Sequence, residues 1–185
     1  MNSNSQSLRN CWNYSICLDI LVCIRHNTRE VLYAEGGIAM RIDTRSNYTS
    51  NREWFRSVLR GKDVVLCHTS ALECLGQFPG YVNENQIDVY TTKREPYENI
   101  NWFLVDGFDD IEIVNVAGLR CTSLNQTVND MLRDYDEIDE QSLAQALADY
   151  YHSNGGNFNG LQIAPQYADR FNYIKDWAVE FYTYE

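Results

Sequence analysis

The chain has 185 residues, of which 44% are hydrophobic, and its formal net charge is -11. A chain of this length and apolar content can bury a sizeable core, which excludes a disordered protein and favours a single domain with at most a small appendage. It contains no run of about 18 apolar residues, the minimum for a membrane span. The apolar stretch at 16–24 lacks the cleavage pattern of an export signal, so we expect a cytoplasmic protein with reduced cysteines and no membrane partner.

The charge is unevenly distributed along the chain. Residues 1–60 contain eight arginines, no lysine and five acidic residues, whereas residues 125–185 contain eleven acidic and three basic residues. Arginine favours bidentate and stacked contacts at interfaces, and an acidic surface repels phosphate backbones but attracts basic proteins. We therefore divide the chain into an Arg-rich extension or subdomain at 1–60 and an acidic interaction domain at 61–185.

The first third predicts little regular structure. Residues 11–24 are apolar nearly all round, which fits a helix or a buried strand equally well. The pair Gly36-Gly37 indicates a turn. A helix is expected around Trp54, with Gly61 as its C-terminal stop.

The middle of the chain predicts a small sheet. Residues 63–66 are expected to form a short buried strand, followed by a short helix that ends at Gly76. Strands are also expected at 87–91, 101–105 and 111–116. Their polar–apolar alternation and the turns between them indicate a largely antiparallel sheet.

The last third predicts helices. Ser123 and Gln126 have the spacing of a capping box, with Gly118 in the turn before them. A second helix is expected at 139–152, and a third begins near Pro165. The fold class is therefore α+β, with helices gathered toward the C-terminus. The stripe that we expect to be buried on the last helix is Tyr167, Phe171, Ile174, Ala178 and one of Phe181 and Tyr182.

Residues with catalytic or metal-binding chemistry do not form a recognisable motif. His68 lies beside Cys67 and near Cys74, but a structural zinc site needs a second pair of ligands, which the sequence does not offer. There is no nucleophile elbow, P-loop or dinucleotide-binding motif. We expect no enzyme activity, no cofactor and no metal.

One acidic cluster supplies an alternative from a different functional class. Asp109, Asp110 and Glu112 could serve a metal-dependent nuclease, because paired carboxylates bind divalent metal ions. The cluster lies at the turn that leads into an expected strand, and charged runs in such places usually form a solvated surface. A non-catalytic role is therefore preferred.

Two groups of residues are candidates for contact with a partner. Arginine and aromatic residues are enriched at binding hot spots and stack on unpaired bases, so the first third is a candidate for protein or nucleic-acid contact. A run of carboxylates near the C-terminal helices could attract a basic partner. The candidates are Trp12, Arg25, Arg29 and Trp54 in the first third, and Asp136, Glu137, Asp139 and Glu140 in the acidic run.

Two segments carry a resemblance to a known family. Residues 67–76, CHTSALECLG, resemble the s-H-x-S-A-L-x-x-x-G stretch of AbiEi-family antitoxins, and residues 113–132 are similar to their G-x-x-v-T-s-x-x-r-T-x-x-D-l-l stretch. The match covers roughly residues 63–150. In the second segment the matching positions are Gly118, Thr122, Ser123, Thr127, Asp130 and Leu132.

The resemblance implies a cytosolic antitoxin of a type IV toxin–antitoxin system, encoded on a mobile element. Such antitoxins neutralise a partner toxin and repress their own operon through an N-terminal winged helix. The segment 1–60 is too short and too irregular for that winged helix, so the resemblance is limited to the interaction domain. Our leading hypothesis is an antitoxin-like protein that binds and neutralises a partner protein.

A second hypothesis keeps the binding function and changes the partner. Some acidic, compact proteins of mobile elements are anti-CRISPR proteins, which bind an RNA-guided CRISPR nuclease. The acidic C-terminal part suits such a basic partner, by analogy of class and charge.

Overall fold

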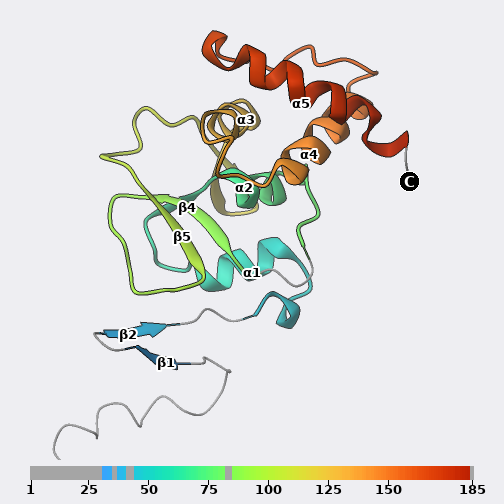
Figure 1. The fold of residues 1–185 in the computed structure, drawn as a ribbon. Helices are drawn as coiled ribbons and strands as arrows, with labels where there is room; N and C mark the ends of the chain where they lie inside the picture. Colours follow the sequence, from blue (N-terminus) through green and yellow to red (C-terminus); the bar gives the residue numbers. More distant parts are fainter. Residues whose placement is uncertain (1–30, 35–36, 41–43, 82–84, 184–185) are drawn as a thin grey trace, which may run out of the picture.

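A computed structural model describes residues 31–34, 37–40, 44–81 and 85–183, and Figure 1 shows their arrangement. The described residues form an α+β fold in which a sheet, a buried helix and a group of C-terminal helices follow one another in layers. The strands are β1 (Val31–Ala34), β2 (Gly37–Met40), β3 (Val64–Leu66), β4 (Ile87–Thr91), β5 (Ile100–Leu104), β6 (Ile113–Val116) and β7 (Leu119–Thr122). The helices are α1 (Asn51–Val58), α2 (His68–Leu75), α3 (Leu124–Arg133), α4 (Glu140–Ser153) and α5 (Ala168–Glu180), with short 3-10 turns at Arg45–Asn47, Pro165–Tyr167 and Phe181–Thr183.

The main sheet has five strands in the order β5-β4-β3-β7-β6, and β1 pairs separately with β2. The sheet is mixed: β3–β4 and β6–β7 are antiparallel, whereas β3–β7 and β4–β5 are parallel. The expectation of a largely antiparallel sheet is therefore corrected. Segment 92–99 carries the chain back to the start of β4, where the Ile87 amide donates to the carbonyl of Asn99, so β5 runs alongside β4 in the same direction.

Strand β7 was not expected from the sequence. It pairs with β6 through the two-residue turn Ala117-Gly118, in which both residues have positive φ, 50° and 82°. Such turns match the twist of antiparallel strands, and glycine adopts this backbone without strain. The prediction that Gly118 lies in a turn is confirmed.

Helix α2 lies at the centre of the fold, between two hydrophobic clusters. Its Ala71 and Cys74 pack with residues of the sheet and α1, whereas its Leu72 packs with residues of α3, α4 and α5. This position explains why most of the helix is buried. The helix ends as the sequence predicted, at Gly76 in the left-handed conformation (φ 80°).

Helix α1 belongs to the same core as the residues that follow position 61. Trp54 and Phe55 are fully buried against Val64, Leu66 and other residues on one face of the sheet. The described residues after position 44, which the sequence placed in an N-terminal part, therefore contribute directly to the main core.

The C-terminal helices match their predicted positions closely. The Ser123 hydroxyl accepts a hydrogen bond from the Gln126 amide at 3.1 Å, so it caps α3 as expected. Helix α4 begins one residue after the predicted start, and α5 is preceded by a 3-10 turn that opens with Pro165. Among the described helices, none combines the length and apolar character that crossing a bilayer requires.

Candidate functional site

The acidic run lies in the connection between α3 and α4. The side chain of Asp136 is 84% exposed, and Glu137 and Glu140 are exposed as well. Asp136 accepts a hydrogen bond from Arg170 of α5 at 3.3 Å. An exposed pair of this kind contributes little to stability, and the exposed carboxylates of Glu137 and Glu140 add negative charge that a partner can reach.

Asp139 has a structural role in the same run. Its carboxylate accepts hydrogen bonds from the amides of Gln141 and Ser142, which caps α4, and a further bond of 2.7 Å from the Tyr81 hydroxyl. Because these contacts occupy its carboxylate, Asp139 has a structural role as a helix cap, in contrast to the exposed members of the predicted group.

The outward face of α5 carries aromatic side chains that the sequence interpretation missed. Tyr173 is 68% exposed and Trp177 is 41% exposed, and they lie one helical turn apart. The exposed carboxylates of Asp169, Asp176 and Glu180 follow the same helical spacing, so the aromatic pair lies among acidic groups. Tyrosine and tryptophan exposed in this way are typical of protein-binding surfaces.

Arg170 fixes this helix face beside the acidic run. Its guanidinium donates to the carbonyls of Leu132 and Arg133 at the end of α3, at 2.7 and 2.8 Å. It also lies 5.9 Å from the centre of the Tyr135 ring. Burial raises the pKa of Tyr135 to about 12, and the negative charge of nearby Glu140 adds to this shift.

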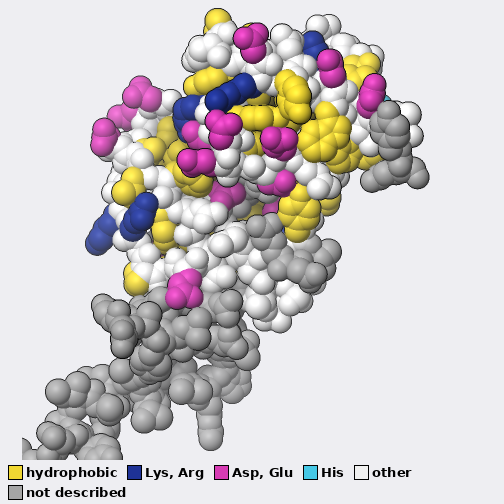
Figure 2. Space-filling view, in the orientation of Figure 1, with side chains coloured by type: hydrophobic (Ala, Val, Ile, Leu, Met, Phe, Trp, Pro, Cys, Tyr) yellow, Lys and Arg dark blue, Asp and Glu magenta, His cyan; other side chains and the backbone are white. Residues whose placement is uncertain are grey.

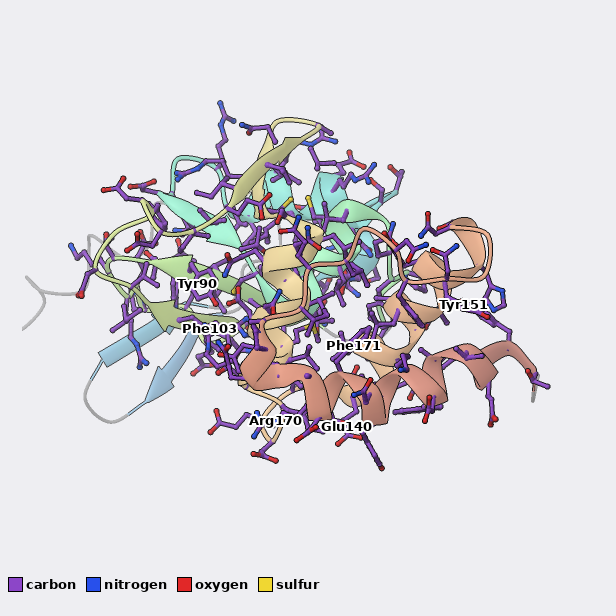
Figure 3. The ribbon with its side chains drawn as sticks, turned by 90° about the horizontal axis from the view of Figure 1, so that it is seen from above. Tyr90, Phe103, Glu140, Tyr151, Arg170 and Phe171 are labelled. Atoms are coloured by element: carbon purple, nitrogen blue, oxygen red, sulfur yellow. The ribbon has the colours of Figure 1, made fainter. Side chains whose placement is uncertain are left out.

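We use the term interaction face for Asp136, Glu140, Tyr173 and Trp177. Figure 3 shows Glu140 and Arg170 on the side of the molecule occupied by α5, and Figure 2 shows acidic and hydrophobic side chains interspersed over the region of the C-terminal helices. The face therefore combines two exposed aromatic rings with negative charge.

A partly buried polar network lies beside the acidic run. Arg133 forms a bidentate pair with Asp134 at 2.7 and 2.9 Å, contacts Asp130 at 3.0 Å and donates to the Tyr90 hydroxyl at 3.0 Å. His68 Nε2 lies 3.0 Å from the carboxylate of Asp134. Burial raises the pKa of Asp134, but the hydrogen bonds from Arg133 and His68 outweigh burial and hold it below its ordinary value. The network ties α2, α3 and β4 together.

Part of this network resembles the arrangement of a nucleophile and its base. His68 Nδ1 lies 3.1 Å from the Cys67 sulfur, and His68 has an unusual positive φ of 46°. However, Cys67 has no exposed surface, and burial raises its pKa well above the ordinary value. Nucleophilic cysteines are accessible thiolates, so the arrangement has the character of a structural link and not of a catalytic pair.

The candidates of the first third divide into two groups. Trp12, Arg25 and Arg29 lie outside the described residues. Trp54 is fully buried, and its prediction as a partner-binding residue is corrected: the indole fills the core, and the Arg45 guanidinium lies 4.8 Å from the centre of its ring.

The carboxylates of the nuclease alternative lie on the surface. Asp109, Asp110 and Glu112 are all exposed in the connection between β5 and β6. Within the part of the chain that the structure describes, no group of three or more His, Cys, Asp or Glu side chains could hold a metal ion. The geometry gives the nuclease alternative no metal site at these residues.

Comparison with known proteins adds no assignment to this geometry. No protein-family model matches the chain, and no curated protein matches it. The resemblance to AbiEi antitoxins therefore depends on the two segments of sequence that show it.

Proposed function

We propose that this chain is an antitoxin-like protein that binds and neutralises a basic, nucleic-acid-binding protein through its interaction face. The observation that carries the proposal is the exposed pair Tyr173 and Trp177, set among carboxylates and beside the acidic run. Aromatic residues supply the affinity of such contacts, and surrounding charges steer the partner and exclude proteins of the wrong charge.

The charge of the face selects the class of partner. A second copy of the same face would bring like charges together, and duplex DNA would meet carboxylates instead of the arginines and lysines that release its counterions. A basic protein gains attraction from the same groups. A toxin and an RNA-guided nuclease are both candidates, because proteins that bind nucleic acid carry basic surfaces.

Isothermal titration calorimetry of the full chain tests the proposal. The titrants are the toxin-like product of a neighbouring gene, a CRISPR nuclease with and without its guide RNA, and free duplex DNA. We expect saturable binding to one of the proteins, weakened by salt, and little binding to DNA. Sequence-specific binding to duplex DNA with no protein bound would overturn the proposal and restore a repressor function.

A further inference from the structure

A cleft opens between the edge strand β5 and helix α3, next to the interaction face. Its volume is about 430 Å³, and its lining includes Phe103, Leu104, Ile111 and Arg133, with Asp110 and Glu137 at its rim. Phe103, Val105 and Ile111 belong to one apolar cluster on this face of the sheet, together with Tyr90. In Figure 3, Tyr90 and Phe103 mark the sheet that forms the floor of this region.

The lining of the cleft has an apolar floor and a charged rim. Phe103, Val105 and Ile111 provide the floor. Arg133 contributes little free positive charge, because Asp130 and Asp134 already hold its guanidinium. The exposed carboxylates of Asp110 and Glu137 therefore set the charge at the mouth of the cleft.

We propose that this cleft receives a lysine or arginine side chain of the protein partner. The aliphatic stem packs on Phe103, Val105 and Ile111, and the cationic head lies between the carboxylates of Asp110 and Glu137. Long basic side chains pack in this way, with the methylene stem on an apolar surface and the charged end in a polar, partly solvated place. The inference rests on the proposed function for the class of partner, and it adds the group that the partner must present.

Other occupants fit the lining less well. A phosphate or a carboxylate would meet two negative charges at the rim and a guanidinium that is already paired. A neutral apolar group would bury part of the rim carboxylates without giving them a partner, which is unfavourable. A basic side chain satisfies both the floor and the rim.

NMR titration of the ¹⁵N-labelled full chain tests the inference with a defined probe. The probe is a heptapeptide with one central lysine, and the matched peptide carries norleucine, which keeps the stem and lacks the charge. We expect saturable shifts at Val105, Ile111 and Glu137 with the lysine peptide and about two- to fivefold weaker binding of the norleucine peptide, the factor expected for one partly exposed ion pair.

Two matched double variants make the test specific to the cleft. Asp110→Asn with Glu137→Gln removes the rim charges and should weaken the lysine peptide by a similar factor. Asp109→Asn with Glu112→Gln removes two exposed charges of the same connection, which lie outside the lining, and should leave binding unchanged. Equal binding of both peptides, equal effects of both double variants, or no saturable shift at all would overturn the inference.

The same titration separates this inference from the proposed function. Replacement of Tyr173 and Trp177 by alanine should abolish binding to a protein partner and leave the lysine peptide bound. If the peptide binds and none of the candidate proteins does, the proposed function fails and the cleft assignment stands. If a protein binds and the peptide does not, the cleft assignment alone is wrong.

Discussion

A buried ion pair links the first described turn to the central helix, and its removal should destabilise the whole fold. Arg45 and Glu73 lie 2.5 Å apart, with side-chain exposures of only 8% and 4%. Arg45 also donates to the carbonyl of Tyr81 at 2.8 Å and lies against Trp54. Arg45→Met would leave the Glu73 carboxylate buried without this partner, which typically costs about 3–5 kcal/mol. For a chain of this size that loss lowers Tm by roughly 6–20 °C.

Urea denaturation followed by circular dichroism measures this effect. Arg56→Met, an exposed arginine on α1, is the matched control and should change stability by less than about 0.5 kcal/mol. The double variant Arg45→Met with Glu73→Leu removes both charges and should cost clearly less than the sum of the single variants. Gly80→Ala should also be destabilising, because the added Cβ would lie 2.7 Å from both the Arg45 guanidinium and the Glu73 carboxyl carbon. The residue also has a φ of 79°, which alanine adopts only with strain. Additive single effects, or an Arg45→Met variant as stable as the Arg56→Met control, would refute the role given to this pair.

Three further predictions concern the core, the polar network and the absence of catalysis. Met131→Asp places an unpaired carboxylate at a fully buried position and should unfold the domain, whereas unchanged melting would show that the core is wrongly assigned. Asp134→Asn should destabilise the protein at pH 7. The folded pKa of Asp134 lies below the ordinary value of 3.8, so its ionisation stabilises the fold above that pH. The difference from the parent protein should therefore shrink as the pH falls below 3.8 and through the lowered pKa; a difference that stays constant as the pH is lowered from 7 to well below 3.8 would contradict this. With Mg²⁺ or Mn²⁺ present, the purified protein should leave DNA and RNA uncut, and cleavage that disappears on replacing Asp109, Asp110 and Glu112 together would restore the nuclease hypothesis.

Local signals in the sequence were sufficient for most of the elements but not for the way in which the strands pair. Ser123 and Gly76 mark helix ends through backbone groups a few residues away, so their roles follow from spacing. Strand direction depends on contacts distant in sequence: β5 is parallel to β4 because segment 92–99 returns along the sheet. Strand β7 has only four residues and ends directly before the helix cap at Ser123, so the sequence pattern showed no separate strand there.

Only part of the candidate site could be predicted from the sequence. Asp136, Glu137 and Glu140 could be recognised as an acidic run, and the structure places them on the surface. Trp54 was misassigned because aromatic content alone does not distinguish a core residue from a surface one. Tyr173 and Trp177 were overlooked although a signal was available, since neither belongs to the stripe of the last helix that was expected to be buried.

The interaction face is tested most directly by comparing three single variants of α5 in the calorimetric titration against the bound protein partner. Tyr173→Ala and Trp177→Ala each remove an exposed ring of the face, and Val179→Ala removes an exposed apolar side chain on the opposite flank of the same helix. Unchanged melting temperatures establish that all three variants are folded. We predict that each aromatic variant weakens binding by about 2 kcal/mol, roughly thirtyfold, and that Val179→Ala binds as the parent protein does. Parental affinity in both aromatic variants would contradict the central claim that this face binds the partner.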